Sequence, residues 1–341
     1  MKAWVYHGPE VLRLETVDDV FPKEHEVKVK VKATGICGSD VHGYAGLTGR
    51  RVPPMIMGHE FSGVVAELGS GVSSLHVGDH VAPYPLSYCG ECEFCRKGMT
   101  HICLKKRAFG VLDCNGSMAE YICVPESTAI KIKDETDFAL AAMVEPLAVA
   151  LRGIHHAGDL RGKHVLIVGA GTIGLFVLAL ARLAHPAKIY ISDLSDHRLA
   201  VARQLGADLV IRSDQQDVPL VVRENTNGLG ADISIECVGI SPTAQQTIAS
   251  LKQGGLAVWI GNSAKMIETN MQAVVTRELM VHGSFLYSLD EFREVIGLLD
   301  RQVIDIRPVI SQEIAFDQVA DMFHQLYQSP GSLIKVIIRA Y

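Results

Sequence analysis

Four closely spaced cysteines form the densest group of metal-ligating side chains in the sequence. Their spacing is C-x2-C-x2-C-x7-C, and the residues are Cys89, Cys92, Cys95 and Cys103. Four thiolates this close together can surround one tetrahedral zinc ion and leave no position open for a substrate. The spacing therefore predicts a structural zinc site in a lobe of residues 87–105, with an iron–sulfur cluster or disulfide bonds as the alternatives.

A glycine-rich run supplies the second chemical motif. Residues 169–174 read G-A-G-T-I-G, and they lie between a strand-like apolar segment and a helix-like one, which is the context that the G-x-G-x-x-G pattern requires. There the backbone can approach a pyrophosphate, and the helix N-terminus offers free N–H groups and a favourable dipole. We expect a dinucleotide to contact Gly169, Gly171, Thr172, Ile173 and Gly174.

An acidic residue follows this run at the end of the next expected strand. Asp193 lies about 20 residues further on, where a carboxylate binds the adenosine ribose hydroxyls. Because a carboxylate would repel a 2′-phosphate, Asp193 favours NAD over NADP. Arg198 nearby keeps NADP open, although it could also stack on the adenine. The structural alternative is a glycine turn in which Asp193 only caps a helix.

Two further segments suggest a second metal site. Cys37 lies in G-I-C-G-S-D-V-H and His59 lies in G-H-E, and a cysteine and a histidine on separate turns of one domain can meet at a zinc ion. Glu145 lies in the apolar stretch M-V-E-P-L, where a buried carboxylate is costly unless it is paired or coordinated. The alternative for His59 is a hydrogen-bonded core histidine.

The elements that must position these residues change in character near residue 145. The first part reads as strand and turn, and we expect a compact all-β barrel with irregular loops. Beyond it, strands and helices alternate, which predicts an α/β unit with a doubly wound parallel sheet. From about residue 284 the chain is expected to return to the first unit. The expected strands are 27–32, 60–68, 78–81, 164–168, 188–192, 231–236 and 256–260, and the expected helices are 139–154, 175–184 and 197–205.

Composition limits the classes of function. The 341 residues suggest about two domains, and the formal net charge of −6 disfavours nucleic acid, which needs a basic surface. We expect no membrane partner, because no apolar run approaches the ~20 residues that span a bilayer. The N-terminal residues show no secretory signal, so a cytoplasmic location is expected.

Taken together, the motifs resemble the zinc-dependent medium-chain dehydrogenases of the alcohol dehydrogenase superfamily. The matching motifs, in order, are G-I-C-G-S-D-x-H, G-H-E-F-S-G, the four-cysteine lobe, V-E-P-L-A and V-G-A-G-T-I-G. The likeness covers essentially the whole chain, and glutamate in V-E-P-L-A resembles the branch of sorbitol, other polyol, butanediol and threonine dehydrogenases. The resemblance implies a Rossmann domain over 148–283 and a mainly β, GroES-like catalytic domain built from 1–147 and 284–341.

The resemblance also implies a ligand set. Cys37 and His59 would hold a catalytic zinc, and Asp40 would orient His59. Glu60 would be a ligand or a close catalytic neighbour. Glu145 would occupy the remaining ligand position, directly or through water, and the sequence does not decide which glutamate is the direct ligand.

Two more groups of residues take their expected roles from the same resemblance. Ser39 would hydrogen-bond the substrate hydroxyl, and His42 would end a proton relay that passes through the nicotinamide ribose. Further contacts with the cofactor are implied for Val238, Ile260 and Phe285.

The implied activity is the reversible, zinc-dependent oxidation of a secondary alcohol to a ketone, with NAD as hydride acceptor and a homodimer or homotetramer as the assembly. Sorbitol-type members often carry Phe-Arg-Tyr late in the chain, whereas this chain has Leu286 in the middle position. Leu286 cannot make a charge-assisted contact with a polyol, which leaves other polyols, sugar alcohols and their phosphates, diols and hydroxy amino acids open. The alternatives are L-threonine 3-dehydrogenase or butanediol dehydrogenase activity and, outside enzymes, a non-catalytic NAD(P)H-binding protein.

Overall fold

The structure is a computed structural model that describes residues 1–112, 114–329 and 331–340. The chain divides into two compact units. The first consists of Met1–Glu145, Ser288–Val303 and Ile310–Tyr341, and the second consists of Pro146–Tyr287 and Ile304–Val309. The segment 304–309 lies within the expected return to the first unit, yet it belongs to the second, because η3 (Arg307–Val309) packs there against helix α6 (Asp196–Gln204).

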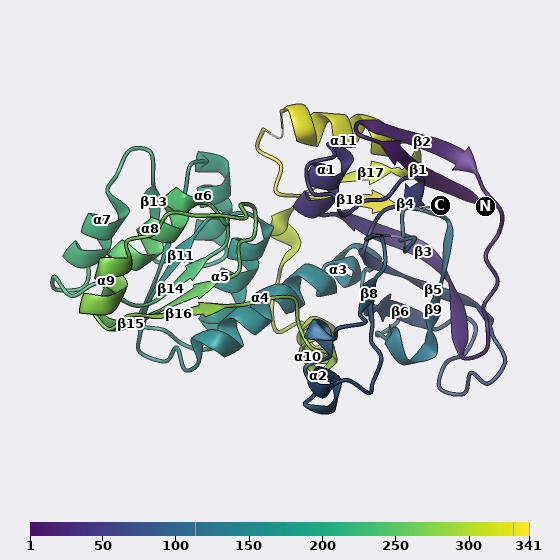
Figure 1. The fold of residues 1–341 in the computed structure, drawn as a ribbon, viewed down its shortest axis with the longest axis horizontal. Coiled ribbons are helices and arrows are strands. Elements are labelled where there is room, and N and C mark those ends of the chain that lie inside the picture. Colours follow the sequence, from purple (N-terminus) through teal and green to yellow (C-terminus); the bar gives the residue numbers. More distant parts are fainter. Residues whose placement is uncertain (113, 330, 341) are drawn as a thin grey trace. The chain divides into compact units, whose positions relative to one another are not determined.

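Seven strands among the described residues form the main sheet of the first unit (Figure 1). On β3, Val27, Val29 and Val31 are at most 1% exposed and pack with Phe61, as the period-two pattern predicts. Lys28 between them is also buried, because an ion pair and an aromatic ring cover its ammonium group. In order across the sheet, the strands are β10 (Ala129–Lys131), β6 (His80–Pro83), β5 (Glu60–Leu68), β3 (Glu26–Ile36), β18 (Lys335–Arg339) and β17 (Ile310–Ala315), with β9 (Tyr121–Pro125) also paired to β3.

Smaller sheets and short helices complete this unit. One sheet has the order β2 (Val11–Thr16), β1 (Lys2–Gly8) and β4 (Met55–Ile56), and another pairs β7 (Leu86–Ser87) with β8 (Arg107–Ala108). The unit is therefore mainly β but not all β. Its helices are α1 (Gly38–Tyr44), α2 (Glu93–Arg96), α3 (Phe138–Ala142), α10 (Leu289–Asp300) and α11 (Val319–Gln328), and its 3-10 turns are η1 (Thr100–Ile102), η2 (Glu126–Thr128) and η4 (Phe316–Gln318).

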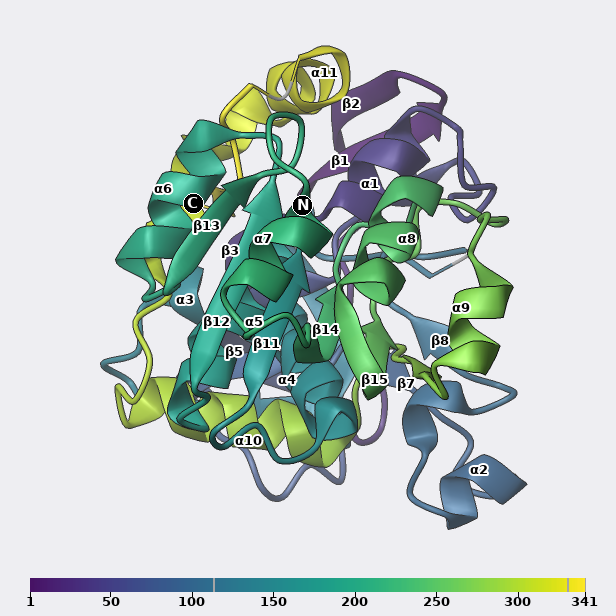
Figure 2. The ribbon, with the colours of Figure 1, turned by 90° about the vertical axis from the view of Figure 1, so that its left-hand side faces the viewer.

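The second unit is built on a six-stranded parallel sheet (Figures 1 and 2). Its strand order reverses between β11 and β14, which confirms the predicted doubly wound α/β fold. The strands, in order, are β13 (Leu209–Arg212), β12 (Lys188–Asp193), β11 (His164–Val168), β14 (Ala231–Glu236), β15 (Leu251–Trp259) and β16 (Met280–Gly283), and every adjacent pair is parallel.

Helices cover both faces of this sheet. Helix α5 contacts α6, and α7 contacts α8. Right-handed crossovers would place the first pair on one face and, after the strand order reverses, the second pair on the other. In the core, Leu166, Tyr190 and Ile211 are fully buried. The helices are α4 (Val144–Ala157), α5 (Thr172–Leu183), α6 (Asp196–Gln204), α7 (Val218–Glu224), α8 (Ser241–Ser250) and α9 (Met271–Thr276).

Two differences between the expected and the observed helices have a local cause. The expected helix 139–154 is interrupted at Met143, between α3 and α4, because Pro146 has no N–H to continue the hydrogen-bond ladder. Helix α5 begins at Thr172 rather than near 175, since Thr172 and Ile173 are only half-buried and so do not join the apolar pattern. Along the described parts of the chain, we find no helix that is both long and apolar enough to cross a membrane.

Candidate metal and dinucleotide sites

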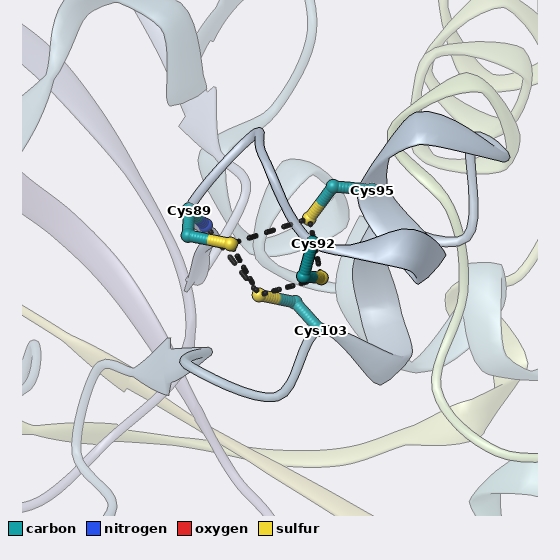
Figure 3. A group of neighbouring side chains, drawn as sticks. All are labelled: Cys89, Cys92, Cys95 and Cys103. Atoms are coloured by element: carbon teal, nitrogen blue, oxygen red, sulfur yellow. Dashed lines mark hydrogen bonds between the residues drawn. The ribbon is translucent and has the colours of Figure 1, made fainter.

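The four cysteines of the lobe converge on one point (Figure 3). Two pairs of sulfur atoms lie 3.9 Å apart, Cys89 with Cys95 and Cys92 with Cys103. Two other pairs lie 3.5 Å apart, Cys92 with Cys95 and Cys89 with Cys103. Zn–S bonds of 2.3 Å at tetrahedral angles separate two sulfur atoms by about 3.8 Å. The donor set therefore fits a closed tetrahedral zinc site.

Backbone amides favour the thiolate form of two of these four cysteines. The N–H groups of Cys95 and Leu104 lower the pKa of Cys92 to about 6. Burial would raise the pKa of Cys103, but the N–H groups of Cys89 and Lys105, 3.4 and 3.3 Å from its sulfur atom, lower it overall. Burial and the neighbouring thiols of Cys92 and Cys103 instead raise the pKa of Cys95 to about 12. Because a thiolate is the form that binds a metal, Cys95 must lose its proton when an ion binds.

A second group of ligands forms where β3 ends and β5 begins. The ligand atoms of Cys37, His59 and Glu60 all lie within 4.8 Å of one another. Cys37 is the N-cap of α1, directly after β3, and His59 directly precedes β5. The structure thus brings together three of the predicted ligands from two segments that are distant in the sequence.

Strand pairing explains why these segments meet. In the antiparallel register of β3 and β5, Gly35 is opposite Glu60, so the residues that follow Gly35 and precede Glu60 emerge at the same end of the pair. A Cβ atom on Gly35 would collide with the Oε2 atom of Glu60. Glycine at this position therefore gives the Glu60 carboxylate its space.

Electrostatic contacts hold His59 in this group. Its Nδ1 atom lies 3.5 Å from the Oδ1 atom of Asp40, and the side chains of the two residues are 12% and 0% exposed. Burial would lower the pKa of His59, but Asp40 and Cys37 raise it well above the ordinary value. Burial would raise the pKa of Asp40, but His59 and Arg51 hold it well below the usual range. Asp40 therefore stays ionised beside the imidazole.

A lysine that the sequence analysis missed completes the centre. The Nζ atom of Lys335 donates hydrogen bonds to Oε1 and Oε2 of Glu60 at 2.9 and 2.7 Å and to the carbonyl oxygen of Ile36 at 3.0 Å. Burial would lower the pKa of Lys335, but Glu60 and Cys37 raise it. The sequence offered one hint of this role, a lysine at the start of the apolar strand β18, but it lies far from Glu60 along the chain.

Glu145 lies near this centre but outside its ligand group. It occupies the first turn of α4 and is 7% exposed. Among the described residues, the set of ligand atoms within 4.8 Å of one another contains Glu60 and not Glu145. The Glu145 charge still raises the pKa of Lys335, so its field reaches the same site.

The two predicted relay residues lie on the exposed side of α1. The hydroxyl of Ser39 donates a hydrogen bond to the Cys37 sulfur atom at 3.3 Å. His42 follows three residues later, and since residues three apart share one face of a helix, it lies on the face of Ser39. Both side chains are exposed, so a substrate could reach them.

The glycine run of the second unit has the shape of a phosphate-binding turn. Gly169 has a φ of +98°, which favours glycine, and its N–H donates to the carbonyl oxygen of Ser192 at 2.8 Å. A Cβ atom on Gly174 would collide with the Gly169 carbonyl oxygen, so helix and strand need glycine to pack this closely. Gly171 is the N-cap of α5, and a Cβ atom added to it would point into open space, which leaves room for a pyrophosphate beside the half-buried Thr172 and Ile173.

Asp193 lies at the end of β12, next to this turn. Its Oδ2 atom accepts the N–H of Ala170 at 2.7 Å, and its Oδ1 atom accepts the N–H of Ser195 at 2.9 Å. Asp193 thus braces the glycine turn as well as the start of α6, where Ser195 is the N-cap. This is the structural alternative to ribose binding, and the two roles are compatible because each carboxylate oxygen has two lone pairs.

The other predicted cofactor contacts lie mostly after the parallel strands. Val238 and Ile260 follow β14 and β15 and are half-buried, and Phe285, two residues after β16, is 42% exposed. Arg198 lies in the first turn of α6. Ligands of such sheets bind beyond the carboxyl ends of the strands, so these positions suit a dinucleotide.

Comparisons with known proteins agree with this arrangement. Residues 23–134 match the alcohol dehydrogenase GroES-like domain, and residues 172–301 match the zinc-binding dehydrogenase domain. The chain is 34% identical to D-xylulose reductase A of Aspergillus oryzae, over 92% of this chain and 89% of that protein. It is 32% identical to sorbitol dehydrogenase of Halalkalibacterium halodurans, over 99% of both.

A solved structure is similar over nearly the whole fold. A zinc-binding dehydrogenase from Sinorhizobium meliloti bound to NADP superposes with a TM-score of 0.93 and 31% identity, covering 99% of this chain and 98% of that one.

The lobe geometry predicts that a zinc ion there stabilises the folded protein and does not contribute to dinucleotide binding. Cys103→Ser should remove about one zinc per chain in elemental analysis and lower Tm by roughly 10 °C, because losing a structural metal is among the largest single-residue effects. NADH affinity should stay within about threefold. Cys123→Ser, at a half-buried cysteine outside both ligand groups, is the matched control. Unchanged zinc content in Cys103→Ser would contradict the assignment.

The position of Asp193 predicts a change in dinucleotide affinity. Asp193→Asn keeps the side-chain shape but removes the charge, and NADH should bind about 10- to 100-fold more weakly because hydrogen bonds to a charged group contribute about 1.5–3 kcal/mol. NADPH should lose less, so the ratio of the two dissociation constants, measured by fluorescence titration, should move toward NADPH. Equal losses for both would show that Asp193 acts only on the fold of the turn.

Proposed function

Because the chain belongs to the zinc-dependent medium-chain alcohol and polyol dehydrogenases, we propose that it oxidises one secondary hydroxyl of a polyol, a sugar alcohol or its phosphate to the ketone, reversibly and with NAD as hydride acceptor. The observation that carries this proposal is the meeting of Cys37, His59 and Glu60 within 4.8 Å. A thiolate, an imidazole and a carboxylate are protein ligands of the kind that hold a catalytic zinc with one position open.

Cys37, His59 and Glu60 would hold this zinc, and the lobe would hold a second, structural one. When bound, a zinc ion with an open position stabilises the deprotonated form of an oxygen ligand, and the pKa of water falls from 15.7 to about 7 in such a site. The donor set fits because its histidine is oriented by Asp40 and its carboxylate by Lys335. Orientation of ligands by such partners is usual at metal sites.

Glu60 is the better candidate for the third ligand. It belongs to the ligand group, and one of its oxygens can bind a metal while the other keeps the ammonium of Lys335. We assign Glu145 an outer role, in which its buried charge acts on the site from beyond the ligand group.

Ser39 and His42 would carry the proton of the substrate hydroxyl. The Ser39 hydroxyl already lies 3.3 Å from the Cys37 sulfur, so a substrate oxygen near the metal would be within reach of it. Ser39 would accept the proton and pass its own through the nicotinamide ribose to His42, which is exposed on the same helix face and would release it toward solvent.

The second unit would bind NAD and orient its nicotinamide, and the bound cofactor supplies the hydride acceptor. Asp193 supports NAD over NADP, although the Sinorhizobium meliloti relative was solved with NADP. The named relatives support a polyol-type substrate, since two of them reduce D-xylulose or oxidise sorbitol by name. Leu286 disfavours sorbitol itself. L-threonine and butanediol remain alternative substrates, and a non-catalytic NAD(P)H-binding role is the alternative outside enzymes.

We propose that the protein assembles as a homodimer or homotetramer. We also propose that it works in the cytoplasm, without nucleic-acid or membrane partners. All four residues of β16 are exposed, with Met280 and Val281 at 57% and 41%. Among the described strands, β16 pairs only with β15, so its other edge offers unpaired N–H and C=O groups. An exposed edge of this kind is a template for pairing with a second chain, and a two-fold axis through it would satisfy both copies.

The ligand assignment predicts selective loss of catalysis. Cys37→Ser and His59→Ala should each lower kcat with NAD at least about 100-fold across a panel of polyols, sugar phosphates, butanediol and threonine, because the metal would no longer be held for the reaction. NADH should still bind to the second unit with about its normal affinity. Cys123→Ser is the control, and near wild-type turnover in either ligand variant would refute the proposal.

The proposed interface predicts a change in mass. Val281→Lys should shift the assembly toward smaller species in size-exclusion chromatography with light scattering, since it places charges on the pairing edge. Val303→Lys, at a residue of similar exposure outside the sheet, should leave the mass unchanged. A monomeric wild-type protein would overturn the proposed assembly.

A further inference from the structure

A buried arginine lies behind the candidate catalytic metal site. The side chain of Arg51 is 3% exposed, and its Nη2 atom lies 2.7 Å from Oδ1 of Asp40, whose side chain is fully buried. Burying two charges is costly unless they are paired with good geometry. Apolar side chains could fill this space without that cost. The buried ion pair is therefore expected to have a role beyond packing.

The Asp40 carboxylate connects Arg51 to two of the proposed metal ligands. Its Oδ2 atom accepts the backbone N–H of Cys37 at 3.3 Å and closes the capping box of α1. Its Oδ1 atom, which Arg51 contacts, also lies 3.5 Å from Nδ1 of His59. A rotation of the Asp40 carboxylate would therefore disturb the thiolate ligand and the imidazole ligand at once.

Gly43 leaves space for the side chain of Arg51. A Cβ atom on Gly43 would lie 2.6 Å from Cγ of Arg51, so the glycine in α1 admits the arginine stem. The Nη1 atom donates to the carbonyl oxygen of Arg50 at 3.3 Å, and the backbone of Arg51 forms a parallel bridge with Leu112. The guanidinium thus has a backbone contact besides Asp40, and we take it as the fixed end of the network.

We propose that Arg51 is a positioning residue of the catalytic metal site: by fixing the Asp40 carboxylate against Nδ1 of His59, it leaves Nε2 of His59 directed to the metal. The proposal rests on the proposed function, in which Cys37 and His59 are ligands. A lysine could keep the charge, but it lacks the planar guanidinium that spans Asp40 and the backbone. Outer partners of metal ligands typically contribute about 10- to 100-fold to metal affinity.

The experiment compares Arg51→Met with Arg51→Lys in the full-length protein. Zinc affinity of the catalytic site is measured by competition with a chelator while the lobe stays loaded, and Co²⁺ substituted at the same site gives an absorption spectrum that reports ligand geometry. We expect Arg51→Met to weaken zinc binding about 10- to 100-fold and to change the Co²⁺ spectrum. Arg51→Lys should recover part of the affinity. In turnover, kcat should fall while the KM for NAD stays constant.

Controls separate this role from folding and from the proposed function. Arg50→Met, at the exposed neighbour, should behave as wild type. Asp40→Asn should weaken zinc binding as well, and adding Arg51→Met to it should cost little more, because the two residues act through one contact. If Arg51→Met does not fold, Arg51→Lys decides, and wild-type affinity and spectrum in that variant would overturn the proposal.

If the wild-type protein binds zinc only in the lobe, the proposed function fails. If the wild-type protein binds zinc at the catalytic site and Arg51→Met binds it equally well with an unchanged spectrum, only the role of Arg51 fails.

Discussion

The antiparallel pairing of β3 with β5 is the constraint on which the candidate catalytic centre depends. It places Gly35 opposite Glu60 and brings Cys37 and His59 to the same end of two neighbouring strands. The missing side chain of Gly35 leaves space for the carboxylate. A shift of one residue in this register would turn the side chains of one strand to the other face of the sheet and would separate the ligands. The buried valines of β3 oppose such a shift, so they also keep the metal ligands together.

Charge compensation is the second requirement of this centre. Asp40, Glu60 and Lys335 are almost completely buried, and each would be costly without partners. Lys335 neutralises Glu60, and Arg51 balances Asp40. The lobe solves the same problem differently, with backbone N–H groups that stabilise sulfur. In both sites the side chains that would bind an ion already lie close together, and an ion that binds must displace the remaining protons from them.

The sequence predicted those parts that depend on local patterns. The strand at His164–Val168, the glycine turn and the four-cysteine spacing each carry a signal within a few residues, and the α/β fold followed from their alternation. Lys335 was missed because its partner Glu60 is 275 residues away, and no local pattern encodes a contact made through the pairing of β18 with β3. Arg51 was missed for a similar reason, since its role depends on the space beside Gly43 in a folded helix.

The central claim is that distant segments of one chain hold an ion between Cys37, His59 and Glu60, apart from the ion of the lobe. Anomalous X-ray diffraction at the zinc absorption edge, from crystals of the zinc-loaded protein, tests it most directly. The account predicts two peaks per chain, one among the four lobe sulfurs and one about 2.0–2.3 Å from the Cys37 sulfur, a His59 nitrogen and a Glu60 oxygen. A single peak in the lobe, or a second peak away from Cys37 and His59, would contradict it.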